Sequence, residues 1–271
     1  MPRLAVLQHA MSDDIDANLV TAERLMAEAA HAGAEIVVFP EVQLSPFFPK
    51  ARRQAQPGIA ERYLMEDDHP ALVRLSELAA RYALVTVANI YRAAPDGQTY
   101  DASPVFDRDG TQLGTSNMVH VAQFEEFWEK DYYAHGSRFE VYDTAVGRVG
   151  VVICYDRHFP ESWRACALAG AEIIATPACN LASENTDLFA QEIAVMAYQN
   201  SVFAAMSNRC GTEGPTTYAG NSVIAGPDGA ILARAGAEES VLMADLDLQH
   251  REDIARKMGW LNELRDDLKP R

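Results

Sequence analysis

The chain is poor in the features that mark metal-binding, secreted and membrane proteins. Its 271 residues contain four cysteines, Cys154, Cys166, Cys179 and Cys210, without a C-x-x-C pair or companion histidines at zinc spacing. This pattern indicates neither a disulfide framework nor a metal site, so a reducing cytoplasm is the expected setting. No apolar run reaches the length of a transmembrane helix, and the N-terminus reads as a strand rather than a signal peptide.

Positive charge is also scarce. There are 23 lysines and arginines against 39 aspartates and glutamates, which gives a net charge of −16. Such a surface argues against nucleic acid or an anionic membrane as the main partner. Hydrophobic residues, by contrast, make up 48% of the chain, which excludes a disordered or fibrous protein. The length is sufficient for one α/β domain over residues 1–271 with a large core.

The order of strand and helix patterns predicts an α/β fold. A strand pattern at residues 4–8 is followed by an amphipathic helix at 16–32 and a buried strand at 34–40. The sequence Gly-Ala-Glu-Ile, an apolar run and a proline occur at 33–40 and again at 170–177. This repetition suggests that the two halves of the chain arose by internal duplication.

Turn residues and apolar periodicity place the remaining elements. In chain order, they predict a helix at 70–82, a strand at 83–91, a hairpin at 100–108 and 111–117, a helix at 189–199, and strands at 201–207, 220–225, 230–235 and 240–246. Residues 118–136 have few regular signals but many aromatic side chains, and such a long segment is expected to line a pocket. From about residue 249 the tail is charged and helical, and we expect it to pack on a neighbouring element or subunit.

Cys154 lies where a buried strand ends and polar residues begin. The apolar run at 149–153 stops at this cysteine, and Pro160 opens a helical pattern soon afterwards. Backbone N–H groups at a strand–turn–helix junction are expected to favour the thiolate. On spacing alone, however, the position is equally compatible with a nucleophile and with an ordinary small core residue.

Glu41 occupies the corresponding place at the end of the strand at 34–40. Functional groups in α/β folds gather beyond the carboxyl ends of strands. Pro40, Pro46 and Phe47 surround this glutamate in the sequence and favour a rigid, walled location over a solvated loop.

Taken together, these residues resemble the nitrilase superfamily of carbon–nitrogen hydrolases. The resemblance extends over essentially the whole chain and is nearest the N-carbamoyl-amine and aliphatic amide hydrolase branch. It is carried by Val-Val-Phe-Pro-Glu41, Ile-Cys154-Tyr-Asp-Arg-His-Phe-Pro-Glu, Glu129-Lys-Asp-Tyr-Tyr-x-x-Gly, Asn208-Arg-Cys-Gly-Thr-Glu213, Gly220-Asn-Ser222 and Pro227-Asp-Gly229. It implies a four-layer α-β-β-α sandwich with mixed parallel and antiparallel sheets, a homodimer or higher homo-oligomer, and no cofactor.

The same resemblance implies a cysteine-dependent hydrolase of a non-peptide C–N bond in a small amide or N-carbamoyl compound. An acyl-thioester would form on Cys154, with Glu41 as the general base at a raised pKa. Glu129 would be a second carboxylate that orients water or the leaving amine. The walls of the substrate site are expected in the loops at 43–56, 121–136 and 180–188.

Three residues just after the cysteine are candidates for substrate binding or for the oxyanion site: Tyr155, Arg157 and His158. The backbone N–H of Tyr155 is suited to donate to an oxyanion. The guanidinium of Arg157 is equally suited to bidentate binding of a substrate carboxylate and to an internal ion pair.

Met118 departs from the family pattern. The family has a lysine two residues before a histidine, and the corresponding segment here reads Ser116-Asn-Met-Val-His120. A thioether neither donates to an oxyanion nor offsets the charge of Glu41 and Glu129. We therefore expect these two carboxylates to repel each other, so that one holds its proton more strongly.

The loss of the lysine leaves three hypotheses. The chain is an active hydrolase, a catalytically impaired homologue that binds a small amide or carboxylate ligand or acts through its oligomer interface, or an enzyme whose substrate supplies the positive charge. Lys130 would restore a cation if it reached the site. It follows Glu129 directly, however, and neighbours on an extended segment point to opposite sides.

Overall fold

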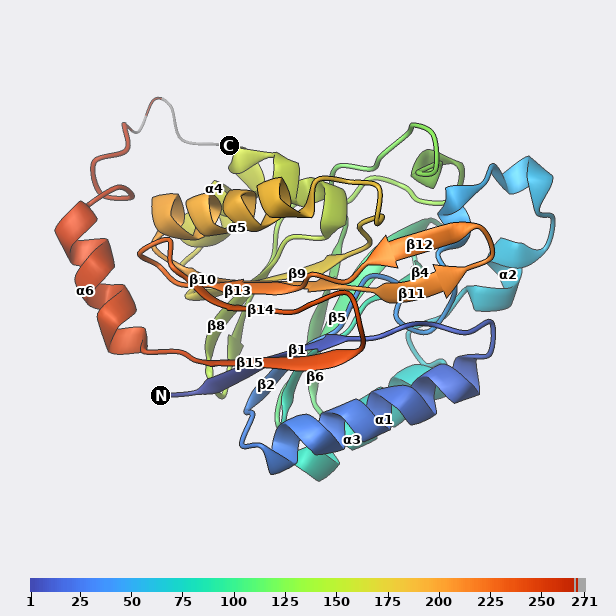
Figure 1. Cartoon of the computed structure of the whole chain (residues 1–271), viewed down its shortest axis with the longest axis horizontal. Coiled ribbons are helices and arrows are strands. Elements are labelled where there is room, and N and C mark those ends of the chain that lie inside the picture. The colour runs from blue at the N-terminus through green and yellow to red at the C-terminus, as the bar shows by residue number, and fades with distance from the viewer. Residues whose placement is uncertain (266, 268–271) are drawn as a thin grey trace.

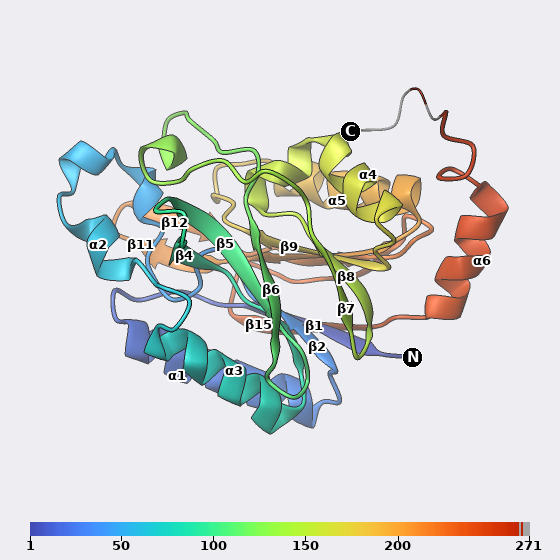
Figure 2. The same cartoon turned by 180° about the vertical axis from the view of Figure 1, so that it is seen from behind.

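Two β-sheets pack face to face in a computed structural model of the chain, which describes residues 1–265 and 267. Helices α1 (Ile15–His31) and α3 (Pro70–Tyr82) cover one outer face, and α4 (Pro160–Leu168) and α5 (Thr186–Asn200) cover the other (Figures 1 and 2). The sheets contain both parallel and antiparallel pairs. These layers confirm the predicted α-β-β-α sandwich.

The first sheet has the order β15-β1-β2-β3-β5-β4, with β6 paired to β5. Strands β1, β2 and β3 are parallel, and the other pairs are antiparallel. The strands are β1 (Arg3–Gln8), β2 (Ile36–Val38), β3 (Val85–Val87), β4 (Ile90–Ala93), β5 (Thr99–Phe106), β6 (Gln112–Asn117) and β15 (Ser240–Asp245). The carboxyl end of β2, where Glu41 follows, therefore lies in the middle of this sheet.

The second sheet has the order β14-β13-β10-β9-β8-β7, in which β8, β9 and β10 are parallel. Its strands are β7 (Val141–Thr144), β8 (Gly147–Val151), β9 (Ile173–Ala178), β10 (Phe203–Asn208), β13 (Val223–Ala225) and β14 (Ile231–Arg234). A separate hairpin consists of β11 (Cys210–Glu213) and β12 (Thr216–Ala219). Strand β2 of the first sheet and β9 of the second are both central and parallel to their neighbours, in keeping with the repeated Gly-Ala-Glu-Ile pattern.

The helices pack one apolar face on a sheet and expose the other. In α1, the Asp14 carboxylate caps the N-terminus by accepting from Asp16 and Ala17, and the inward face buries Leu25 and Met26. The remaining helical segments are α2 (Ile59–Tyr63), α6 (Leu248–Met258) and the 3₁₀ turns η1 (Phe48–Lys50), η2 (Arg53–Ala55), η3 (Glu129–Asp131) and η4 (Cys154–His158).

Helix α6 and the segment after it lie beside the second sheet and its helices (Figure 1). Arg251 donates to the carbonyl of Ser201, and the Trp260 ring packs on Tyr198 of α5 at 5.8 Å. The tail thus contacts a neighbouring element of the same chain. The part of the tail at 266 and 268–271 lies outside the described residues.

Two expectations about strands were wrong. The single strand predicted at 83–91 is split into β3 and β4, because the backbone of Asn89 pairs with Gln43 instead of continuing the sheet. Strands β7, β11 and β12 were not predicted at all. They are short and carry many polar residues, so their sequences lack the apolar alternation that identifies a strand.

Candidate active site

Three of the predicted residues meet between the two sheets. Glu41 follows β2, and its backbone N–H donates to the carbonyl of Ala178 at the end of β9, 3.4 Å away. Cys154 follows β8, and Glu129 enters from the loop at 118–136. Glu41 and Glu129 are completely buried, and Cys154 is 4% exposed. The carboxyls of Asp101 and Glu129 and the Cys154 thiol are ionisable groups that act on the pKa of the Glu41 carboxyl.

The backbone at Cys154 is held in a strained conformation. Its φ is +40°, in the left-handed region that side chains other than glycine rarely adopt. Strand β8 ends at Val151, three residues earlier, and Cys154 begins the turn η4. Strain of this kind costs about 1–3 kcal/mol and is typical of functional positions.

The thiol of Cys154 is not favoured as a thiolate in the resting site, contrary to the expectation from its place near a helix start. Burial raises its pKa well above the usual value, and the nearby carboxyls of Glu41 and Glu129 raise it further. Arg157, whose Nη1 lies 3.7 Å from Sγ, lowers it. Helix α4 begins only at Pro160, six residues after Cys154, and the macrodipole effect falls off within the first turn of a helix. Attack by this thiol therefore requires a base.

Glu41 has the environment of such a base. Burial raises its pKa well above the usual value, and repulsion from Asp101 and Glu129 acts in the same direction. No described amide, hydroxyl or ring donor reaches either carboxylate oxygen. A raised pKa brings a carboxylate closer to the affinity needed to take a proton from a thiol.

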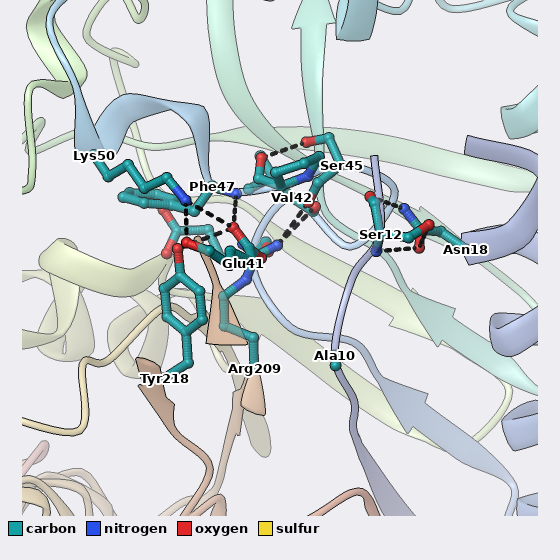
Figure 3. Close-up of polar contacts among 12 residues, drawn as sticks. Ala10, Ser12, Asn18, Glu41, Val42, Ser45, Phe47, Lys50, Arg209 and Tyr218 are labelled. Carbon is teal, nitrogen blue, oxygen red and sulfur yellow. Dashed lines mark hydrogen bonds and ion pairs between the residues drawn. The ribbon is translucent and has the colours of Figure 1, made fainter. Parts of the chain in front are cut away.

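Arg209 clamps the loop that carries Glu41 (Figure 3). Its Nη2 donates to the carbonyls of Glu41, Val42 and Ser45 at 3.2, 3.2 and 2.9 Å. The guanidinium is completely buried, and its Nη1 pairs with Glu213 at 2.8 Å. Three carbonyls on one cation fix the backbone around the carboxylate, which explains why Val42 tolerates a φ of +41°.

Glu213, the partner of Arg209, also binds residues around the Glu41 loop. Its Oε2 accepts from the backbone N–H of Phe47 at 2.9 Å and from the Tyr218 hydroxyl at 3.1 Å, and Lys50 Nζ lies 3.6 Å from it (Figure 3). The motif Asn208-Arg-Cys-Gly-Thr-Glu213 therefore acts on the Glu41 loop from the second half of the chain.

Glu129 stands at the start of η3, and its two oxygens differ. Oε2 accepts from the N–H of Ala122 at 2.8 Å, whereas Oε1 has no hydrogen-bond donor among the described residues. Burial raises the pKa of this carboxyl to about 8. Lys130 is exposed and points away, as expected, although the segment is a 3₁₀ turn rather than a strand.

Met118 lies at the end of β6 and is completely buried. Its N–H donates to the carbonyl of Asp101, and its own carbonyl accepts from Gly136. The two residues after it are bound by the Asp156 carboxylate, which accepts from the N–H groups of Val119 and His120 at 3.0 and 2.7 Å. This segment is thereby fixed to η4 beside Cys154.

Arg157 makes internal contacts. Its Nη1 donates to the Cys154 carbonyl at 3.0 Å, its Nη2 donates to Asn180 Oδ1 at 2.7 Å, and its Nε lies 3.5 Å from Glu192. His158 shares the same Glu192 carboxylate through Nδ1 at 2.8 Å. Of the two roles open to Arg157, the contacts favour the internal ion pair.

A small pocket opens onto the thiol, with a cavity volume of about 20 Å³. Its walls include the predicted loops at 121–136 and 180–188 but no residue of the loop at 43–56. The lining residues are Ala122, Phe124, Phe127, Glu129, Cys154, Tyr155, Arg157, His158, Cys179, Asn180 and Glu184. This volume is close to that of one water molecule and far below the usual range for ligand sites.

Comparison with known proteins agrees with this geometry. The family model described as carbon-nitrogen hydrolase matches residues 3–256. The chain belongs to the carbon–nitrogen hydrolase family. It is 33% identical to N-carbamoylputrescine amidase of Solanum tuberosum, over 98% of this chain and 92% of that relative. It is 30% identical to Omega-amidase NIT2 of Danio rerio, over 98% and 95% of the two chains.

Solved structures show the same fold. A carbon–nitrogen hydrolase from Helicobacter pylori G27 matches with a TM-score of 0.90 and 25% identity, covering 98% of this chain and 96% of that one. A mutant of the amidase from Nesterenkonia sp. AN1 matches with a TM-score of 0.83 and 25% identity, covering 98% and 95%. It carries the acetamide moiety of fluoroacetamide on its active-site cysteine. The present carbon–nitrogen hydrolase is thus an enzyme of the amidase type.

Sequence reasoning did not find Asp101 or Asn89. Both are buried polar residues in or beside strands, and their importance depends on neighbours far away in the sequence. Asp156, Arg209 and Glu213 belonged to quoted motifs but had no assigned role. In the described part of the chain, no helix is long and apolar enough to cross a membrane, and no cluster of three or more potential ligands could hold a metal ion.

Proposed function

We propose that this enzyme hydrolyses the C–N bond of a small amide or N-carbamoyl compound through an acyl-thioester on Cys154. The observation that carries the proposal is the burial of a thiol against Glu41 at the base of a small pocket, with Glu129 in its wall. A thiol with a raised pKa beside a carboxyl with a raised pKa is suited to proton transfer during attack.

In the first half of the reaction, Sγ of Cys154 bonds to the substrate carbonyl carbon as its proton passes to the Glu41 side. The carbonyl π electrons move to oxygen, which we place near the backbone N–H of Tyr155. When the C–N bond breaks, the leaving nitrogen takes a proton from Glu41. In the second half, Glu41 removes a proton from water, which attacks the thioester and returns Cys154 to the thiol.

Glu129 is suited to act as a hydrogen-bond donor in both halves. With a pKa of about 8, it is mostly protonated at neutral pH, and its Oε1 is unpaired in the pocket wall. A neutral carboxylic acid can donate to a substrate oxygen as a lysine ammonium would, though without its charge. This role gives the site a donor despite Met118.

The charges around the pocket favour a substrate with a cationic or neutral end over an anionic one. Both basic side chains of the lining, Arg157 and His158, lie against the Glu192 carboxylate. Glu184 stands in the wall and forms no ion pair within 4 Å with a described residue. We therefore favour an N-carbamoyl amine, such as the substrate named in the plant relatives, over the monoamide of a dicarboxylic acid.

The test combines product analysis with mass spectrometry of the intact protein. The enzyme is mixed separately with N-carbamoylputrescine, glutaramate and propionamide, and ammonia release and acyl adducts are measured. We expect turnover of the carbamoyl amine, weaker turnover of propionamide and very little of glutaramate. Cys154→Ala should abolish adduct and turnover, whereas Cys179→Ala, which removes the other thiol of the pocket wall, should retain both.

If no amide is turned over and no adduct forms on Cys154, the chain is instead an impaired homologue, and the hydrolase proposal fails. Preferential turnover of glutaramate would overturn the charge argument alone, because it would require Arg157 to leave Glu192 and bind the substrate carboxylate.

We also propose that the chain forms a homo-oligomer. Apolar side chains are exposed on the outer helices: Leu188 and Val195 on α5 are 54% and 47% exposed, and Leu168 on α4 is 37% exposed. Light scattering coupled to size-exclusion chromatography should give a mass of at least twice 29.8 kDa. A monomer at micromolar concentration would refute this.

A further inference from the structure

Asp101 is a buried carboxylate that the mechanism above does not use. It lies within β5, is completely buried, and acts on the pKa of the Glu41 carboxyl, as Glu41 acts on that of Asp101. Its Oδ1 accepts from Asn89 Nδ2 at 2.7 Å, but its Oδ2 has no N–H or hydroxyl donor among the described residues. Both oxygens of Glu41 are in the same state. Three of the four oxygens of these two buried carboxylates have no N–H or hydroxyl donor in the described part of the chain. Such a pair would raise the free energy of the folded protein unless one of the two groups is protonated.

The side chain of Asn89 holds this arrangement together. Its Oδ1 accepts from the N–H of Val42, the residue after Glu41, at 2.6 Å. Its Nδ2 donates to Asp101 and also to Ser103 Oγ at 3.0 Å. One side chain therefore joins the backbone of the Glu41 loop to the Asp101 carboxylate. This connection also explains the break between β3 and β4, because Asn89 bonds to the Glu41 loop and to Asp101 instead of continuing the pairing of the sheet.

The main charges of described residues that act on the pair do not include a lysine. Glu41 and Asp101 are faced by ionisable groups from the surrounding elements, namely Glu129, Tyr133, Cys154, Asp156 and the guanidinium of Arg209. Arg209 is the sole cation in this set, and it is bound to Glu213 and to backbone carbonyls. One of the two adjacent carboxylates must therefore be neutralised by a proton.

We infer that Asp101 and Glu41 share one proton, and that Asp101 is the positioning residue that allows Glu41 to act as a base without a lysine. The inference rests on the proposed function. Together the two carboxyl groups carry one negative charge in the resting enzyme. The shared proton lies on Glu41, since Asp101 is the weaker base of the two.

The pKa shifts agree with this assignment. Burial raises the pKa of Asp101 only to about 6, and its hydrogen bond with Glu41 lowers it relative to burial alone. Burial and the same contact raise the pKa of Glu41 well above its usual value. Such a pair titrates with two apparent pKa values that belong to both groups.

The attack step then proceeds with balanced charges. As Sγ of Cys154 bonds to the carbonyl carbon, its proton passes to Glu41, and the proton already on Glu41 passes to Oδ2 of Asp101. The two carboxyl groups become neutral, and the negative charge moves to the oxyanion. When the C–N bond breaks, both transfers reverse, and the leaving nitrogen takes the proton from Glu41.

The test measures the reactivity of Cys154 and needs no substrate turnover. Iodoacetamide alkylation of Cys154 is followed from pH 4 to 9 by mass spectrometry with peptide mapping. Asp101→Asn retains the acceptor for Asn89 but removes the charge. In the wild type the acidic limb of the rate profile marks protonation of Asp101, which receives the relayed proton. In Asp101→Asn the limb is set by Glu41 alone, so we expect it to move by at least one pH unit. We also expect a plateau lower by about tenfold, because Glu41 becomes a weaker base.

The matched control is Ser116→Ala, which removes a buried hydroxyl from β6 that contacts Tyr142 at 3.1 Å. Its profile should coincide with that of the wild type. An unchanged limb and plateau in Asp101→Asn, or an equal shift in Ser116→Ala, would overturn the inference. A shift in Asp101→Asn without hydrolysis of any amide would support the carboxyl pair and refute the hydrolase proposal.

A second measurement uses the wild-type protein, in case Asp101→Asn does not fold. Isotope-edited infrared spectra with ¹³C-labelled aspartate carboxyls report protonation of buried aspartates during a pH titration. Asp156, also buried, is removed from the comparison by repeating the titration on Asp156→Asn. We expect an aspartic acid band that appears at about pH 6, above the usual aspartate value, as the pair takes up its second proton. A single step at the usual aspartate pKa would contradict the shared proton.

Discussion

Arg209→Met provides a direct test of how the Glu41 loop is held. Methionine has a similar length and removes the cation while keeping the apolar contacts of the side chain. Three loop carbonyls at 2.9–3.2 Å then lose their donor, and the Glu213 carboxylate, whose side chain is 8% exposed, loses its partner at 2.8 Å. Water cannot replace these bonds, because the guanidinium is completely buried.

The expected cost follows from the burial of the pair. Removing one partner of a buried ion pair typically costs about 3–5 kcal/mol, because the remaining charge stays desolvated. Lys50 remains 3.6 Å from Glu213 and offsets part of the loss, so we expect a decrease of about 3–4 kcal/mol in the free energy of unfolding. The three carbonyl bonds are included in this figure, because losses within one network are not additive.

Urea unfolding at pH 7 and one fixed protein concentration measures this change. Arg3→Met is the matched control: Arg3 also pairs with a carboxylate, Asp245 at 2.6 Å, but both side chains are more than 40% exposed. We expect its effect to be much smaller. Arg209→Lys, which keeps the charge but loses the fork geometry, should fall between them. The reasoning is refuted if Arg209→Met destabilises the protein no more than Arg3→Met does.

Three further predictions concern the carboxylates of the site. The pKa of Glu129 in the folded protein is about 8, above the usual 4.5. Protonated Glu129 therefore contributes stability to the fold that is fully present below about pH 4.5 and is lost as the pH rises through 8. The free energy of unfolding of Glu129→Gln, relative to that of the wild type, should therefore increase by roughly 2–5 kcal/mol between pH 4.5 and 8.5. A difference between the two proteins that stays constant with pH in urea unfolding would contradict this. Glu41→Gln should slow acylation of Cys154 by at least about 100-fold, as expected for loss of a general base, and rates within threefold of wild type in stopped-flow assays would exclude that role. Met118→Lys should lower the pKa of Glu129 and move the acidic limb of Cys154 alkylation to lower pH; an unmoved limb would show that position 118 does not face the carboxylates.

Much of the site could be predicted because its residues stand at ends of elements. Local patterns point to Glu41 and Cys154, because each follows a buried strand. They mark the aromatic-rich segment around Glu129 only as a pocket wall, and Glu129 itself was predicted from the family resemblance. The raised pKa of Glu41 was also expected from its walled position, and burial does raise it. The environment of the thiol was predicted wrongly, because the sequence does not show that the turn at Cys154 separates it from helix α4 and places it among carboxylates.

The sequence by itself determined the alternation of strands and helices and the places of Glu41 and Cys154 after buried strands, because periodicity and the ends of strands are local properties; the four-layer fold and the roles of the thiol, Glu41 and Glu129 were predicted from the family resemblance. Only the tertiary structure decided that Asp101 lies beside Glu41 and that Arg209 holds the Glu41 loop. These contacts join residues 60 and 168 positions apart in numbering, and their partners are chosen by the register of β5 and by the packing of one sheet on the other. A buried aspartate in a strand looks the same in sequence whether its neighbour is an amide or a base. The physical difference arises when the two sheets close and water leaves the space between them.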